Sequence, residues 1–169
     1  MVGSMAEGRD GRDCPRLCET VAAATPSIVG LTITESGYRL GPDEMIDTAV
    51  ARATPLGRLV TALDARRRAG VGGLAVVSCD NLSRNGDVAR RAILSLARVF
   101  DSSLAWWIAS EISFVNSSVD RITPRATAAD GEDVAQATGY RDRSPVVTEP
   151  FHNWIVSGDF PAGRPAWGH

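Results

Sequence analysis

Short apolar runs alternate with longer amphipathic segments along the middle of the chain. Three runs have the length and the β-branched character of buried strands, and they cover residues 27–34, 74–77 and 112–115. Two longer segments carry apolar residues at helical spacing, from Pro55 to a stop at Gly70 and from Gly86 to Phe100. Strands that alternate with helices predict an α/β fold with a largely parallel sheet flanked by helices.

The first long helix has ordinary signals at both ends. Thr54-Pro55 offers a hydroxyl N-cap followed by proline in the first turn. The run 66–68 is three arginines, which suit the negative end of a helix dipole, and we interpret it as a solvated helix end. Residues 104–108 are predicted to form a short packing helix whose tryptophans, Trp106 and Trp107, belong to the core.

The two ends of the chain are less regular. Residues 1–23 are rich in Gly, Arg and Asp, and we expect them to be disordered or atypical. Residues 128–138 read as a short acidic helix that Gly139 ends. Val146 and Val147 are expected to begin a strand, and an extended or mixed segment follows from Phe151 to Phe160.

Each of the three main predicted strands ends in a polar cluster. These clusters are Thr34 to Tyr38, Ser78 to Asn81, and Asn116 to Ser118. The carboxyl ends of parallel strands meet at one edge of a sheet, which is where open α/β folds build ligand sites. The same residues also fit an alternative in which they only cap turns and helix starts, with Asp120 and Arg121 as a surface ion pair. The pattern leaves both interpretations open.

Composition narrows the class of partner. The chain has 169 residues, of which 44% are hydrophobic and 22% charged, as in ordinary globular domains. A net charge of −2 gives no reason to expect nucleic acid or an anionic membrane as a partner. No apolar run approaches the ~20 residues of a membrane span, and no signal peptide is recognisable, so a cytoplasmic location is expected.

The reactive residue types exclude several mechanisms. All 18 basic residues are arginines, so this chain supplies no lysine base or Schiff base. Cys14 and Cys18 have neither a partner cluster nor a nearby histidine, so no metal site is predicted there, and Cys79 is interpreted as a small buried residue at a strand end. His152 and His169 are the only histidines, and no Ser-His-Asp set can be assembled from them.

The stretch Ile112-x-Phe114-x-x-Ser117-x-Val119-Asp120-Arg121-Ile122-x-Pro124 resembles the signature of the long-chain mannitol dehydrogenase family. Three further stretches resemble the same family in the right order: 32–38, 78–81 with Asn85-Gly86, and 149–151 through 163–165. The resemblance covers residues 24–167 and implies a partial Rossmann-type NAD-binding domain.

The resemblance also implies a reaction. Family members move a hydride between a nicotinamide cofactor and a polyol or sugar acid, such as mannitol and fructose or mannonate and fructuronate. Asn116 matches an asparagine that donates a hydrogen bond to the reacting oxygen, and Asp120 and Arg121 are expected to bind substrate. The residues expected to line the NAD cleft are Thr34, Glu35, Ser78, Asp80 and Asn81. Val115 and Ser118 stand where the family tends to have proline and methionine.

The resemblance implies that complete family members are longer than this chain. The chain contains no G-x-G-x-x-G turn after a strand, so we expect the first βαβ unit to be missing. We also expect the helical C-terminal domain, which supplies the family's catalytic lysine, to be missing. We therefore interpret the chain as an incomplete copy, with a non-catalytic nucleotide-binding or interaction module as the alternative. Self-association through an exposed sheet edge is expected.

Overall fold

The computed structural model describes residues 6–38, 48–120 and 123–167. These residues form two compact units. The first unit consists of two segments, one that ends at Ser117 and one that begins at Val156. The second unit is Ser118–Ile155. The first unit carries the sheet edge at which the sequence predicts a site.

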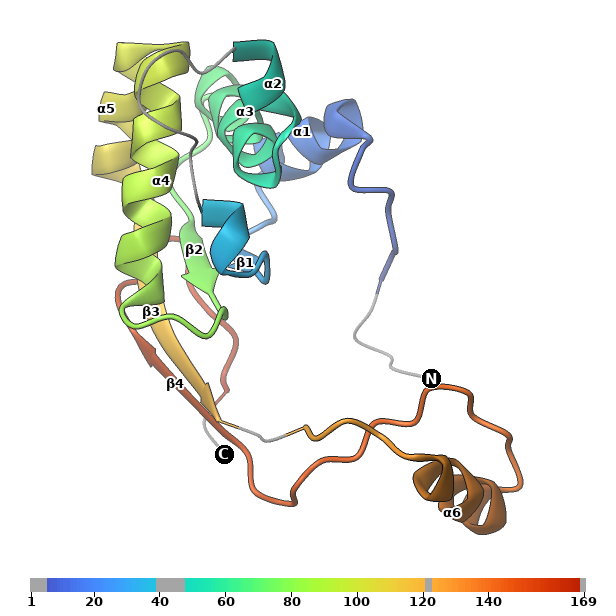
Figure 1. The fold of residues 1–169 in the computed structure, drawn as a ribbon. Coiled ribbons are helices and arrows are strands. Elements are labelled where there is room, and N and C mark those ends of the chain that lie inside the picture. Colours follow the sequence, from blue (N-terminus) through green and yellow to red (C-terminus); the bar gives the residue numbers. More distant parts are fainter. Residues whose placement is uncertain (1–5, 39–47, 121–122, 168–169) are drawn as a thin grey trace. The chain divides into compact units, whose positions relative to one another are not determined.

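The elements of the described residues alternate as the sequence predicts (Figure 1). In chain order they are α1 (Cys14–Ala22), β1 (Ile28–Leu31), the 3₁₀ turn η1 (Glu35–Tyr38), α2 (Thr48–Ala53), α3 (Pro55–Arg68), β2 (Ala75–Ser78), α4 (Asn85–Phe100), α5 (Ser102–Glu111), β3 (Ser113–Asp120), α6 (Ala128–Thr138) and β4 (Asn153–Ser157). The four strands form one sheet in the order β1-β2-β3-β4. Both β1–β2 and β2–β3 are parallel pairs, so the predicted α/β fold is confirmed.

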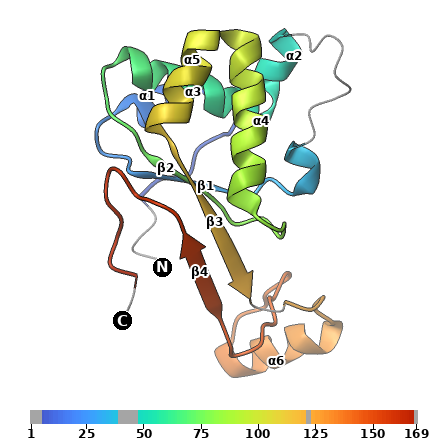
Figure 2. The ribbon, with the colours of Figure 1, turned by 90° about the vertical axis from the view of Figure 1, so that its left-hand side faces the viewer.

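Most of the core lies between the sheet and its helices. Side chains from α1 to α5 pack with Leu31, Leu74 and Val76 in one cluster, and Figure 2 shows α4 and α5 lying side by side. A smaller cluster on the other face contains Ala75, Val77 and Val115. Strand β2 is therefore buried on both faces, which explains the apolar run from Leu74 to Val77.

The C-terminal part of the first unit covers the smaller cluster. Val156 and Phe160 pack against it, and Gly158 comes so close to Val115 that an added Cβ atom would lie 3.1 Å from the Val115 Cα atom. No helix contributes to that cluster among the described residues. This face of the sheet is thus packed by the end of β4 and by the segment that follows it.

Helix α3 begins and ends as predicted, but one of its three last arginines is buried. The Thr54 hydroxyl accepts a hydrogen bond from the Gly57 N–H, as an N-cap should. The interpretation of 66–68 as a solvated helix end is wrong for Arg66, which is 2% exposed. Its guanidinium donates to the carbonyl oxygens of Val21, Ala23, Gly72 and Gly73, which ties α1 to the loop before β2.

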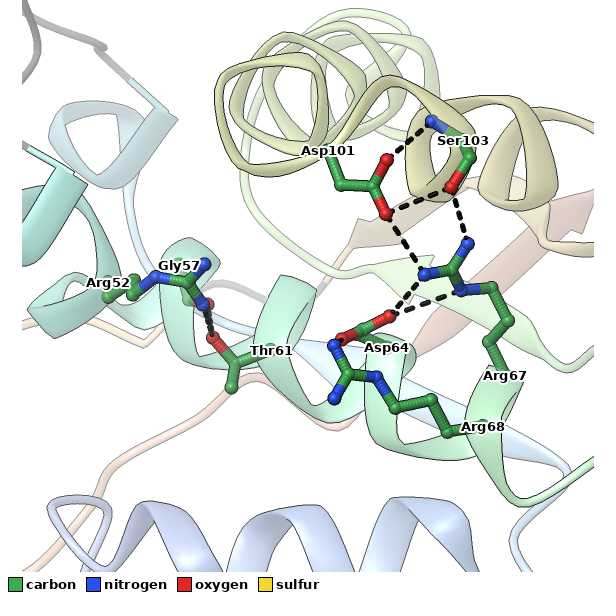
Figure 3. A network of polar contacts seen from close by, with 8 residues as sticks. All are labelled: Arg52, Gly57, Thr61, Asp64, Arg67, Arg68, Asp101 and Ser103. Carbon is green, nitrogen blue, oxygen red and sulfur yellow. Dashed lines mark hydrogen bonds and ion pairs between the residues drawn. The ribbon is translucent and has the colours of Figure 1, made fainter.

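The two neighbouring arginines form ion pairs near the surface (Figure 3). Arg67 binds Asp64 at 2.8 Å and Asp101 at 3.1 Å, and Arg68 binds Asp64 at 2.6 Å. Asp101 also caps α5 by accepting from the Ser103 N–H at 2.8 Å. These contacts join the end of α3 to the start of α5.

Four further expectations are corrected. Helix α1 occupies part of the segment expected to be disordered or atypical, and its Asp13 side chain caps it. Strand β3 does not stop at Asn116 but continues to Asp120. Val146 and Val147 lie in no strand. Trp106 is 73% exposed, whereas Trp107 packs against the core as predicted.

Strand β1 is an edge strand of the described sheet. Its outer side has no strand partner among the described residues, and self-association through it stays a prediction. Within the same residues, none of the helices combines the length and apolarity that a membrane crossing requires.

Candidate functional site

Side chains after β1, after β2 and within β3 meet at the carboxyl edge of the sheet. One continuous set of hydrogen bonds joins them, and we call it the carboxyl-edge network. Its members are the backbone of Ile33 and Thr34 and the side chains of Tyr38, Ser78, Asp80, Asn85, Asn116 and Ser117. The network belongs entirely to the first unit.

Asp80 holds the turn that follows β1. Its Oδ1 accepts from the Thr34 N–H at 2.8 Å, and its Oδ2 accepts from the Ile33 N–H at 3.1 Å. Thr34 has a φ of 63°, a left-handed conformation that a β-branched residue rarely adopts. Backbone strain of this kind persists only where the surroundings impose it and is concentrated at functional sites. The carboxylate of Asp80 is one such restraint.

Tyr38 links that carboxylate to the buried end of β2. Its hydroxyl donates to Asp80 Oδ2 at 2.6 Å and lies 2.8 Å from the Ser78 Oγ atom. Burial, followed by the hydrogen bond to Asp80, raises the pKa of Tyr38 well above its ordinary value. The phenol therefore remains a neutral donor throughout the physiological pH range.

Asn85 connects the start of α4 to the backbone of β3. It is 1% exposed, and its Nδ2 atom donates to the Asp80 carbonyl at 3.0 Å and to the Ser117 carbonyl at 2.8 Å. Its Oδ1 atom accepts from the N–H groups of Gly86 at 2.8 Å and Ser117 at 2.9 Å. The side chain pairs with Ser117 much as a neighbouring strand would.

Asn116, which lies in β3, caps the same helix. Its Oδ1 atom accepts from the N–H groups of Gly86 at 2.9 Å and Asp87 at 3.3 Å. Arg84, which stands at the N-cap position of α4, makes no such bond with its own side chain. The Asn116 amide is thus fixed by its oxygen, and its Nδ2 atom has no hydrogen-bond partner among the described residues.

The residues predicted for the cofactor cleft separate into two groups. Thr34, Glu35 and Asn81 are exposed at the edge, where a ligand can reach them. Ser78 is 0% exposed, so its expected role in cofactor binding can only be indirect. Asp80 is half-buried, and both of its carboxylate oxygens accept hydrogen bonds within the network.

The two residues predicted to bind substrate are not among the residues that define this network. Asp120 is the last residue of β3 and belongs to the second unit. Arg121 lies outside the described residues. Their role in substrate binding stays a prediction.

Sequence reasoning gave no role to Tyr38, Asn85 or Ser117. All three stand in the stretches that resemble the family, but each has a partner 32 to 42 residues away in the chain. Long-range pairs of this kind leave no periodic signal. The sequence signal that could have indicated Asn85 is the dipeptide Asn85-Gly86, which begins α4 shortly after the polar end of β2.

The described residues contain no group of three or more histidine, cysteine, aspartate or glutamate side chains that could hold a metal ion. Cys14, Cys18 and Cys79 are free thiols in this structure. The exposed side chains at this edge, Thr34, Glu35 and Asn81, offer a hydroxyl, a carboxylate and an amide.

Residues 1–169 match the family model of the mannitol dehydrogenase Rossmann domain. The chain belongs to the mannitol dehydrogenase family. This confirms the resemblance that the four stretches indicated, and it confirms the Rossmann-type fold.

Curated relatives lie in the same family. The chain is 42% identical to the mannitol 2-dehydrogenase of Cereibacter sphaeroides over 165 residues, which cover 91% of this chain and 34% of that protein. It is 34% identical to the D-mannonate oxidoreductase of Escherichia coli (strain K12), with 99% of this chain and 37% of that protein covered. The chain thus spans about a third of the length of these relatives.

Two solved structures have the same fold. The Pseudomonas fluorescens mannitol 2-dehydrogenase, in a ternary complex with NAD and D-mannitol, has a TM-score of 0.84 and 36% identity. That match covers 98% of this chain and 36% of the other. A substrate-free D-sorbitol dehydrogenase has a TM-score of 0.81 and 36% identity, and the match covers 91% of this chain and 34% of that one.

Proposed function

We propose that this chain is part of an NAD-dependent oxidoreductase that moves a hydride between a nicotinamide cofactor and a polyol or sugar acid. The observation that carries the proposal is the match of the whole chain to the mannitol dehydrogenase Rossmann domain. Relatives named for mannitol and mannonate support substrates of the mannitol–fructose or mannonate–fructuronate kind.

The exposed groups of the carboxyl edge suit the nicotinamide end of such a cofactor. Thr34, Glu35 and Asn81 are accessible there and offer hydroxyl, carboxylate and amide groups. Asp80 and Ser78 support this edge from within the network. When bound, the cofactor supplies or accepts the hydride. The protein's own task is to orient the reactants and to stabilise the charge that develops on the reacting oxygen.

Asn116 is the residue we propose as the donor to that oxygen. Its oxygen atom is held by the N-terminus of α4, which leaves the Nδ2 atom to donate. An amide fixed in this way does not titrate and needs no reorganisation as negative charge builds up. The alternative donor is Asn81, an exposed amide for which no hydrogen bond occurs among the described residues. Its freedom to rotate makes it the less preorganised of the two.

A chimera tests the proposal. Residues 24–167 replace the matching segment of the Cereibacter sphaeroides mannitol 2-dehydrogenase, which provides the rest of a complete enzyme. Turnover of mannitol with NAD, or of fructose with NADH, supports the proposed reaction. A folded chimera that binds NADH without turnover favours the non-catalytic nucleotide-binding alternative, and one that neither binds NADH nor turns over contradicts the proposal.

Variants of this chimera then compare the two asparagines. Asn116→Ala is expected to lower kcat about 100- to 1,000-fold with little change in the NADH dissociation constant, because it removes a donor used in the transition state. Asn116→Asp is expected to be worse, because a carboxylate repels a developing alkoxide. Asn81→Ala is the matched comparison. A large kcat loss for Asn81→Ala, with Asn116→Ala only less stable, would transfer the role to Asn81.

A further inference from the structure

We infer that Asn85 is a positioning residue that aims the side-chain amide of Asn116. The inference rests on the function proposed above, because the aim matters only if Asn116 acts on a reacting oxygen. Asn85 itself is buried, so it has no access to a cofactor or substrate. Its influence on a reaction can only pass through the groups that it holds.

The hydrogen-bonding capacity of Asn85 is fully used. Its two N–H groups donate to two carbonyl oxygens, and its Oδ1 atom accepts from two backbone N–H groups. These partners come from the loop after β2, from the first turn of α4 and from β3. A side chain that is saturated by three separate segments fixes them relative to one another.

Two of the four bonds hold the residue next to Asn116. The Ser117 N–H and C=O both bind Asn85, at 2.9 Å and 2.8 Å, so the backbone on the carboxyl side of Asn116 is pinned. If these two bonds were lost, Ser117 would still be joined to β2 by the hydrogen bond from its Oγ atom to the Ser78 carbonyl.

The other contact reaches the Asn116 side chain more directly. The Gly86 N–H is shared, because it lies 2.8 Å from Asn85 Oδ1 and 2.9 Å from Asn116 Oδ1. Asn85 therefore sets the position of the donor that orients the Asn116 amide. Because the amide is planar, fixing its oxygen against α4 also fixes the direction in which its Nδ2 atom points.

The close packing of α4 on β3 makes this arrangement sensitive to small shifts. A Cβ atom at Gly86 would lie 2.7 Å from the backbone nitrogen of Asn116. A tilt of the first turn of α4 therefore moves the cap and the Asn116 amide together. Displacements of ~1 Å in a positioned group can cost ~100-fold in rate.

A double-mutant cycle in the chimera tests the inference. The proteins are wild type, Asn85→Ala, Asn116→Ala and the double variant, and the measurements are kcat, the NADH dissociation constant and Tm. Asn85→Ala is expected to lower kcat about 100-fold with little change in NADH affinity. In the Asn116→Ala background, the same substitution is expected to cost no further kcat, because its effect passes through the missing amide.

Arg66→Met is the matched control for lost stability. Arg66 is also buried and donates to four carbonyl oxygens, but it binds the loop at the opposite, amino end of β2. It is expected to lower Tm and to leave kcat unchanged. An Asn85→Ala variant with the same profile, or kcat losses that multiply in the double variant, would overturn the inference. Asn85→Ser provides the same cycle with a milder change if the alanine variant does not fold.

A second readout needs no activity. In the 169-residue chain, NMR can follow the side-chain amide pair of Asn116, assigned by its loss in Asn116→Ala. This pair is expected to shift or broaden in Asn85→Ala and to stay in place in Arg66→Met. An unchanged pair in Asn85→Ala overturns the inference whatever the chimera does. If the folded chimera shows no turnover, the proposed reaction is contradicted. If the chimera is active and Asn85→Ala keeps its full kcat, only the role of Asn85 is contradicted.

Discussion

Gly86 lies against the backbone of Val115, so that an added Cβ atom would stand 2.6 Å from the carbonyl carbon and oxygen of that residue. Backbone atoms cannot move aside as a flexible side chain can. The glycine is therefore what lets the first turn of α4 approach β3 closely enough for the asparagine caps to form.

Gly86→Ala should accordingly push α4 away from β3. We expect a loss of about 1–3 kcal/mol in the free energy of unfolding, as for other overpacked sites, measured by urea denaturation. Gly30→Ala is the control, because a Cβ atom at Gly30 meets no heavy atom within 4 Å. Equal effects of the two substitutions would contradict the steric explanation.

Local signals predicted most of the fold. Thr54 with Pro55 fixed the start of α3, and Gly139 fixed the end of α6, because caps act through neighbouring backbone groups. Arg66 was misjudged for the opposite reason. Its partners include the carbonyl oxygens of Val21 and Ala23, more than 40 residues away, and nothing local indicates that a helix end will be covered by α1.

The candidate site shows the same limit. Parallel strands brought Thr34, Asp80 and Asn116 to one edge, as their positions after or within apolar runs predicted. The direction in which each side chain turns was not predictable. Asp80 turns into the network and Asn116 turns its oxygen toward α4, because unsatisfied backbone N–H groups lie there.

Asp101→Asn tests how much the negative charge of Asp101, which pairs with Arg67, stabilises the contact between α3 and α5. The hydrogen bonds from Ser103, and secondarily Arg67, lower the pKa of Asp101. A lowered folded pKa means that the stabilisation is present above the unfolded value of ~3.9 and is lost as pH falls through the folded pKa. We expect Asp101→Asn to lower Tm near neutral pH and to lose this effect in acid. A Tm difference that is equal in both conditions would exclude the ionised carboxylate as its cause.

Cys18 should react slowly with alkylating reagents in the folded chain. Burial, and then the neighbouring Cys14, raise the pKa of Cys18 to about 11, so little thiolate is present near neutral pH. Trypsin cleavage after Arg16 places Cys14 and Cys18 on different peptides, and mass spectrometry can then follow iodoacetamide labelling of Cys18 alone. The rate is expected to increase with pH and on unfolding in urea. Labelling near neutral pH that is as fast in the folded as in the unfolded chain would refute this prediction.

Tyr38→Phe tests the bond between the β1 turn and the end of β2. The substitution keeps the ring but removes the hydroxyl that donates to Asp80 and contacts Ser78, and leaves these buried or half-buried groups short of one partner. We expect a loss of about 1–3 kcal/mol in the free energy of unfolding. Tyr140→Phe is the matched control, because that side chain is exposed and should change stability little.

The pH dependence of the same pair of proteins separates the hydrogen bond from simple packing. Because burial raises the folded pKa of Tyr38, the folded state keeps the phenol proton at pH values at which the unfolded chain has lost it. The contribution of the neutral phenol is therefore complete below the unfolded pKa of ~10 and is lost as pH rises through the folded value. Urea denaturation should show a constant gap between wild type and Tyr38→Phe from about pH 6 to about pH 9, and a smaller gap above about pH 10. A gap that persists unchanged in alkali would mean that the ring, and not its hydroxyl, holds the turn.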